Sequence, residues 1–147
     1  MKDGFIRFTT MLSGIMRNIR RIMSDTAAAY NVKRSYISVI YYIYRHGPLS
    51  AAKLCSLCGE DKANISRTLK ALEDEGYITK QIRASARPSV RMVLTEQGED
   101  VGRFLEARVA EAVKVATAGI EPENIAIMYE VLARIDENLA AVADDCN

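Results

Sequence analysis

Small, polar and basic side chains share one face of a helix predicted over residues 62–75. At 100° per residue, the residues opposite its apolar side are Ala63, Ser66, Arg67 and Lys70. An arginine can donate two hydrogen bonds to guanine N7 and O6, a serine hydroxyl can bond to a base or a phosphate, and an alanine methyl can contact the methyl group of thymine. This face therefore has the chemistry to read base edges in the major groove of duplex DNA.

Other residues near this helix could bind phosphates. Asn64, on the flank near the helix start, could read adenine or bind phosphate. Lys53 and Lys62 lie near predicted helix starts, where backbone N–H groups already favour an anion. The predicted DNA-contacting set is Ser50, Lys53, Lys62, Ala63, Asn64, Ser66, Arg67, Lys70, Arg83, Arg87 and Arg91. The alternative interpretation is that these side chains only keep exposed helices soluble.

Two cysteines, Cys55 and Cys58, form a Cys-x-x-Cys pattern. Two such ligands usually need two more to hold zinc, and the sequence offers only His46 and the distant Cys146. We therefore predict no metal site and expect the thiols to pack as small apolar groups. Redox sensing through Cys55 or Cys58 remains an alternative.

Four tyrosines lie within nine residues of a helix predicted over residues 32–46, namely Tyr36, Tyr41, Tyr42 and Tyr44. They could line a pocket for a small aromatic ligand, since tyrosine combines a flat apolar ring with a hydroxyl. The alternative is that they are core and interface residues whose hydroxyls have protein partners.

Residues typical of an enzyme are missing from the sequence. His46 is the single histidine and closes a predicted helix, where a donor side chain suits the last carbonyls. There is no nucleophile motif, no carboxylate pair placed by spacing and no glycine-rich phosphate loop. We expect neither catalysis nor a cofactor.

The charge of the chain is divided unevenly along its length. Residues 1–94 contain 16 Lys+Arg against 7 Asp+Glu, whereas residues 95–147 contain 4 against 12, so the two segments carry +9 and −8 and the whole chain +1. A basic segment of this size favours a polyanionic partner. No apolar run approaches the ~18 residues of a membrane span, no secretory signal is recognised, and three cysteines suit a reducing compartment. These features predict a cytoplasmic protein.

The positioning elements follow from periodicity and helix ends. We predict helices over residues 2–28, 32–46, 51–58, 62–75 and 95–118 and from 122 onward, with strands over 77–83 and 89–94. Asn31, Ser50, Asp61 and Thr95 are the predicted N-caps. Two short helices with a tight turn, followed by a hairpin, make a winged helix-turn-helix. The predicted fold is therefore mainly α with a small β-hairpin wing.

The first and last helices each have an apolar stripe with alternating spacings of three and four residues. The stripes comprise Phe5, Phe8, Leu12, Ile15, Ile19 and Ile22, and Ile125, Met128, Leu132, Ile135, Leu139 and Val142. Little of the chain is left to cover them, so we expect these helices to pair with each other and with a second copy. Within one integrated domain, residues 1–30 and 96–147 would then serve dimerisation and residues 31–95 DNA binding.

The sequence resembles the MarR family of regulators over roughly residues 31–100. The matching segments are Ile40–Ser50, Leu54, Asp61–Arg67, Leu72–Ile78 and Leu94–Gly98, the last being a Leu-Thr-x-x-Gly that directly follows the wing. The resemblance implies a homodimer that binds operator DNA through a winged helix-turn-helix, usually as a repressor and often relieved by a small ligand.

The wing tip departs from the family pattern. Members commonly have Asp-x-Arg there, whereas this chain has Ala86-Arg87-Pro88. Arg87 can still reach the minor groove, but nothing in the turn orients it. The favoured hypothesis is a ligand-responsive repressor that binds duplex DNA as a homodimer. The alternatives are a redox-sensing version and a winged-helix adaptor that has lost operator binding.

Overall fold

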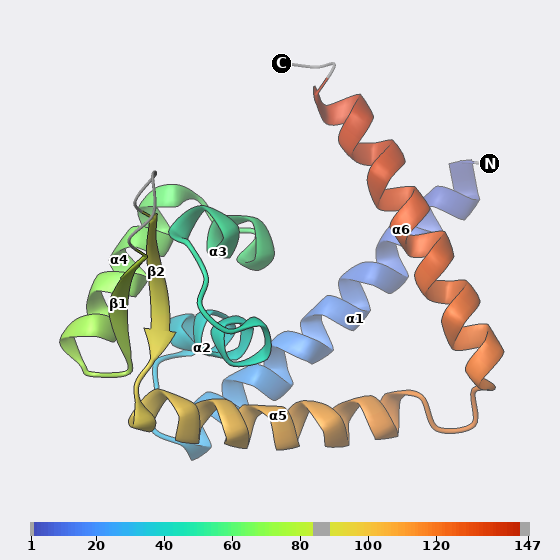
Figure 1. The fold of residues 1–147 in the computed structure, drawn as a ribbon. Helices are drawn as coiled ribbons and strands as arrows, with labels where there is room; N and C mark the ends of the chain where they lie inside the picture. The colour runs from blue at the N-terminus through green and yellow to red at the C-terminus, as the bar shows by residue number, and fades with distance from the viewer. Residues whose placement is uncertain (1, 84–88, 145–147) are drawn as a thin grey trace. The chain divides into compact units, whose positions relative to one another are not determined.

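The computed structural model describes residues 2–83 and 89–144. Within these ranges the elements in chain order are α1 (Lys2–Ala29), α2 (Arg34–His46), α3 (Ala51–Cys58), α4 (Lys62–Asp74), β1 (Ile78–Arg83), β2 (Ser89–Leu94), α5 (Glu96–Ala116) and α6 (Pro122–Asp144) (Figure 1). The predicted fold class is confirmed: the chain is mainly helical with one antiparallel hairpin. It forms two compact units, Met1–Arg108 and Val109–Asn147. No described helix is both long and apolar enough to cross a membrane.

The core of the first unit is built around α2. Ile37, Val39, Ile40 and Ile43 are all buried, because nearly every side of this helix is apolar. Buried side chains from α3, α4, the hairpin and α5 complete the same cluster. Figure 1 shows α3 and α4 beside the hairpin. The winged helix thus rests on one central helix.

Three of the predicted helix caps are confirmed. Ser50 Oγ accepts a hydrogen bond from the Lys53 N–H at 3.2 Å, and Asp61 Oδ1 accepts one from the Asn64 N–H at 2.8 Å. Thr95 Oγ1 accepts from the Gly98 N–H at 3.2 Å. Each side chain satisfies a backbone donor that the first helical turn leaves without a partner. These bonds set the starting points of α3, α4 and α5.

The predicted N-cap of the second helix is wrong. Asn31 has φ 56°, a left-handed conformation, and lies in the turn that follows α1. The backbone N–H of Val32 bonds back to the carbonyl of Ala27 at 3.0 Å, so this segment completes the end of α1. Lys33 takes the N-cap position, without a side-chain cap bond. Asparagine tolerates left-handed geometry, which makes it as suitable for a turn as for a cap.

The hairpin, called the wing below, pairs β1 with β2 in a register from Ile78↔Leu94 to Arg83↔Ser89. Met92 and Leu94 are buried, whereas Val90, predicted on the same face, is 45% exposed because it lies beyond the core. Leu49 adds a short antiparallel bridge to Met92, with N–H···O distances of 3.2 and 2.7 Å. This bridge attaches the wing to the segment between α2 and α3.

Candidate nucleic-acid interface

The inner face of α4 is buried as predicted. Ile65, Leu69 and Leu72 all lie in the core. Their spacing of four and three residues places them on one side of the helix. Since these anchors are buried, the rotation of α4 about its axis is fixed, and so is the face that it turns outward.

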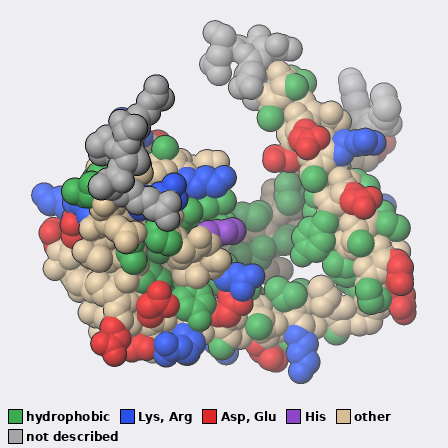
Figure 2. All heavy atoms as spheres, viewed as in Figure 1, with side chains coloured by type: hydrophobic (Ala, Val, Ile, Leu, Met, Phe, Trp, Pro, Cys, Tyr) green, Lys and Arg blue, Asp and Glu red, His purple; other side chains and the backbone are tan. Residues whose placement is uncertain are grey.

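The outer face of α4 is open to solvent. Its exposed residues are Lys62, Ala63, Ser66, Arg67 and Lys70, and Asn64 is half-buried on the flank. Lys and Arg side chains are visible around α3 and along the outer side of α4 (Figure 2). Short side chains at Ala63 and Ser66 leave room for close approach, and the cations between them suit an anionic partner.

A chain of polar contacts runs along the start of α4. The Arg67 guanidinium donates to Oδ1 of Asn64. The Asn64 side-chain amide in turn donates to Glu60 Oε2 at 3.1 Å and to Asp61 Oδ2 at 3.3 Å. Because the amide donates to two carboxylates, its oxygen is turned toward Arg67. Sequence reasoning treated Asn64 as a base or phosphate contact and missed Glu60, because Glu60 precedes the N-cap Asp61 and lies outside the helix, where side-chain spacing does not predict a pairing.

Lys53 and Ser50 lie at the start of α3. The Lys53 side chain is exposed, and the Ser50 hydroxyl oxygen is occupied as the cap acceptor. The hydroxyl hydrogen remains able to donate to a phosphate oxygen. The backbone N–H groups of the helix start add to the preference for an anion at this point.

The three wing arginines are placed differently. Arg91 is half-buried and its Nη1 donates to the carbonyl of Pro48 at 3.1 Å, so it also holds the wing to the α2–α3 segment. Arg83 ends β1, opposite Ser89. Arg87 and the Ala86-Arg87-Pro88 tip lie outside the described residues.

Two acidic side chains at the C-terminal end of α4 are paired with lysines. Glu73 accepts a bond from Lys80 of β1, and Glu75 accepts one from Lys33. In contrast, within residues 2–83 and 89–144 no carboxylate forms an ion pair with Lys53, Lys62 or Lys70. The cations on this side therefore keep their charge available for a phosphate backbone.

The Cys55 and Cys58 side chains are half-buried and pack against the core. Burial, with smaller contributions from the charges of Glu60 and Cys55, raises the pKa of the Cys58 thiol to about 11. A thiol at neutral pH is a poor nucleophile compared with a thiolate. In the described part of the chain, no group of three or more His, Cys, Asp or Glu side chains is arranged to hold a metal ion.

The four tyrosines of α2 point to different neighbours. Tyr36 is buried and faces the end of α4, where its hydroxyl donates to Glu75 at 2.6 Å. The pKa of Tyr41 is raised by burial and, to a smaller extent, by the charge of Glu106. The pKa of Tyr42 is raised by burial and, to a smaller extent, by the charge of Cys58. Tyr44 rests on α5, since a Cβ at Gly102 would lie 2.4 Å from its Cδ2. The structure does not gather the four rings around one point, and the ligand-pocket hypothesis stays a prediction.

A model of the MarR family matches residues 30–87, which run from the turn after α1 through α2, α3, α4 and β1. Over these residues the chain is similar to the MarR family. The resemblance drawn from the sequence is thereby confirmed, and α4, the helix that carries Arg67, lies within the matched segment.

Solved structures show the same MarR-type fold. Transcriptional regulator PA3341 superposes with a TM-score of 0.83 at 24% identity, covering 91% of this chain and 98% of its own. A MarR family transcriptional regulator from Listeria monocytogenes, complexed with a 26mer DNA, has a TM-score of 0.81 at 20% identity and coverages of 90% and 89%. A MarR family regulator from Silicibacter pomeroyi has a TM-score of 0.76 at 17% identity, with coverages of 87% and 86%.

Proposed function

We propose that this protein is a transcription regulator that binds a specific duplex-DNA site as a homodimer. The observation that carries the proposal is the division of α4 into a buried face and an outer face of Ala63, Ser66, Arg67 and Lys70. Arg67 would read a guanine, while Lys53, Lys62 and the helix starts would bind phosphates. The similar protein from Listeria monocytogenes, which is complexed with DNA, supports this reading.

Exposed apolar stripes support the dimer. In α1, Leu12, Ile15 and Ile19 are exposed, and in α6 so are Leu132 and Leu139. Such stripes at spacings of three and four residues are typical of helices that pair with another helix. A dimer would present two recognition helices to two half-sites about one duplex turn apart.

Repression, with relief by a small aromatic ligand, is the expected mode of action. A ligand can change DNA binding only by binding better to one separation of the recognition helices than to another. Two tyrosines of α2 contact the helices whose relative positions such a change would alter. Tyr36 contacts the end of α4, and Tyr44 contacts α5. A screen of aromatic acids for release of bound DNA tests this part of the proposal.

The first experiment is selection of binding sites from a random duplex pool with the purified protein. The winner is then titrated against a scrambled duplex at two salt concentrations. The expected result is a two-fold-symmetric site, bound at least ~10³-fold more tightly than the scramble and weakened by salt. Substitution Lys62→Gln should reduce the slope of log affinity against log salt by about one for each protomer that binds.

Failure to enrich any sequence would contradict operator binding. Weak and equal affinity for both duplexes would instead favour an adaptor that uses the winged helix to bind protein, since the wing tip lacks the usual acidic residue. A monomeric protein by analytical ultracentrifugation would contradict the dimer alone.

A further inference from the structure

Two charged residues of the first unit, Lys33 and Glu75, lie at helix ends that do not favour their charge. Glu75 is the C-cap of α4, where the carbonyl groups already make the surroundings negative. Lys33 is the N-cap of α2, where the N–H groups make them positive, and its side chain makes no cap bond. Local breaches of helix preference of this kind often mark a site with another role.

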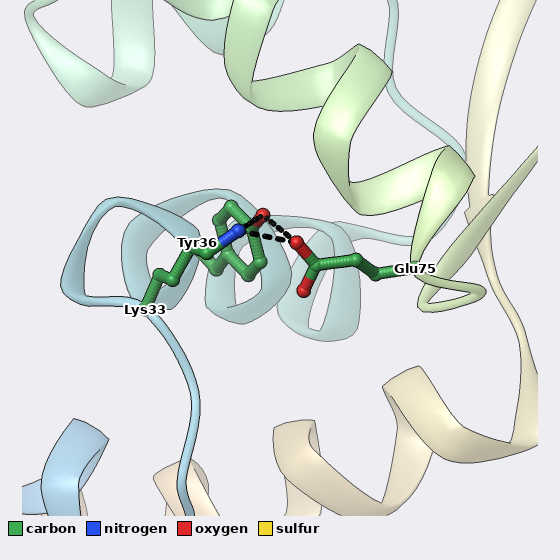
Figure 3. Close-up of polar contacts among 3 residues, drawn as sticks. All are labelled: Lys33, Tyr36 and Glu75. Atoms are coloured by element: carbon green, nitrogen blue, oxygen red, sulfur yellow. Dashed lines mark hydrogen bonds and ion pairs between the residues drawn. The ribbon is translucent and has the colours of Figure 1, made fainter.

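The two charges meet each other and a buried tyrosine. Lys33 Nζ donates to Glu75 Oε1 and, at 3.0 Å, to the hydroxyl of Tyr36, which itself donates to Glu75 Oε1 at 2.6 Å (Figure 3). The Lys33 ammonium also lies 5.1 Å from the centroid of the Tyr36 ring. Lys33 and Tyr36 thus both donate to the same oxygen of Glu75. The positive and negative charges offset each other, and each lies at a helix end that does not favour it.

The Tyr36 ring anchors this cluster to the core. Its residue is only 2% exposed, and the ring meets Tyr77 edge-on with centroids 6.0 Å apart. Tyr77 lies in the turn between α4 and β1, and its N–H bonds to the Leu72 carbonyl at 2.9 Å. Burial raises the pKa of Tyr36, and the two bonds lower the pKa of Glu75, so the hydroxyl stays protonated and the carboxylate charged near neutral pH.

The cluster also lies next to the turn that leads out of α1. Two residues before Lys33 is the left-handed Asn31, and the Tyr30, Asn31 and Val32 N–H groups all bond to carbonyls at the end of α1. This short, hydrogen-bonded connection leaves little slack between α1 and Lys33. The position of Lys33 is thus linked to the direction of α1 on one side and, through Glu75, to the end of α4 on the other.

We propose that Lys33, Tyr36 and Glu75, called the clasp below, are positioning residues that set the separation of the two recognition helices in the dimer. The clasp ties the C-terminal end of α4 to the turn after α1, the helix whose exposed stripe would contact the second copy. The inference rests on the proposed function, because a separation between recognition helices has meaning only in a DNA-binding dimer.

The exposure of the Lys33–Glu75 pair argues for positioning rather than for bulk stability. The Lys33 and Glu75 side chains are 63% and 41% exposed. Exposed ion pairs contribute little to the free energy of unfolding. They can still select one of two nearby arrangements of α4, because small energies decide between states that differ little.

The test compares the full-length protein with Glu75→Gln, Tyr36→Phe and Lys33→Met on three kinds of duplex. These are the selected site, the same site with its half-sites moved apart by one or two base pairs, and a single half-site. Each base pair moves a half-site by about 3.4 Å along the axis and rotates it. Glu73→Gln is the matched control, since it removes the same charge two residues away and breaks only the bond to Lys80.

The expected result is a change in spacing preference without loss of half-site binding. Clasp variants should bind the selected site about fivefold more weakly and discriminate less among spacings, while half-site affinity stays within about twofold of wild type. Glu73→Gln should keep the spacing preference. The reversed pair, Lys33→Glu with Glu75→Lys, should restore it, because each charge then also suits its helix end.

Three outcomes would overturn the inference. Clasp variants with the spacing preference of Glu73→Gln would show that the clasp sets no separation, while the proposed function would stand. Equal loss of full-site and half-site binding would assign the clasp to folding of α4 alone. If the wild-type protein selects no site, the proposed function fails and the clasp proposal falls with it.

Discussion

Arg67 is the residue on which the proposed base readout depends most. Its side chain is exposed and is held by Asn64 on the outer face of α4. We predict that Arg67→Ala weakens binding to the selected site by about 1–3 kcal/mol and relaxes the preference at one base pair. Stability should be nearly unchanged, since surface substitutions usually alter it little.

Titration against the selected duplex and its single-base variants measures this effect. Arg103→Ala is the control, because Arg103 is also exposed and pairs with Asp100 on α5. An Arg67→Ala variant with wild-type affinity and preference would remove Arg67 from the interface.

Cys58 provides a test of the redox alternative. Because burial raises its pKa to about 11, from an ordinary value of 9.0, the folded thiol should react with disulfide reagents more slowly at pH 7 than in the denatured chain. A group whose pKa is raised by folding stabilises the fold below its unfolded pKa. This contribution should fall as the pH rises from about 9 toward 11.

Thiol titration of the native protein and of a Cys58→Ser variant measures the first effect, and denaturation across this pH range measures the second. Rapid reaction of Cys58 at pH 7, with loss of DNA binding on oxidation, would favour the redox-sensing regulator instead.

At the scale of elements, Gly98 lets the start of α5 pack closely against Tyr77 and Leu94. A Cβ at Gly98 would lie 2.2 Å from the Tyr77 carbonyl oxygen and 3.0 Å from Leu94 Cδ2. A backbone carbonyl oxygen can move away from such a close contact only at a substantial cost in free energy. We therefore predict that Gly98→Ala lowers the free energy of unfolding by about 1–3 kcal/mol. This close approach accounts for the glycine of the Leu-Thr-x-x-Gly motif.

Gly4→Ala is the matched control, because an added Cβ at Gly4 in α1 would meet no atom within 4 Å apart from its chain neighbours and the nearby backbone of its own helix. It should raise stability slightly, by about 0.5–1 kcal/mol, since alanine is the better helix former. Chemical denaturation at one protein concentration compares the two. Equal stability of Gly98→Ala and wild type would show that the contact is not tight.

At the scale of the whole molecule, the proposed dimer depends on apolar stripes exposed in each unit. Ile15 is 54% exposed in the middle of the α1 stripe. We predict that Ile15→Asp shifts the protein toward monomer, because a carboxylate in an apolar helix interface loses its hydration. Binding to the two-fold-symmetric site should then fall much more than binding to a half-site.

Sedimentation equilibrium measures the association, with Thr10→Asp as the control. Thr10 is exposed on the side of α1 away from the stripe, so the same charge should leave the dimer intact. A dimeric Ile15→Asp variant would exclude this stripe from the interface.

The elements and the rotation of α4 about its axis were readable from the sequence. Periodicity placed Ile65, Leu69 and Leu72 in the core, and cap residues at Ser50 and Asp61 marked helix starts that the structure reproduces. These features depend on spacing along one helix or on a bond to a residue three positions away. Local sequence contains all that is needed to predict them.

Tertiary structure decided what these elements contact. It made Asn31 part of a turn rather than a cap, bridged Leu49 to Met92, and used Arg91 to hold the carbonyl of Pro48. It also joined Lys33 to Glu75, 42 residues later in the chain. Each outcome depends on a partner that is distant in sequence, and a side chain that can bond in several ways takes the partner that packing brings near. Local pattern therefore determined which residues face outward, and three-dimensional packing determined what holds them there.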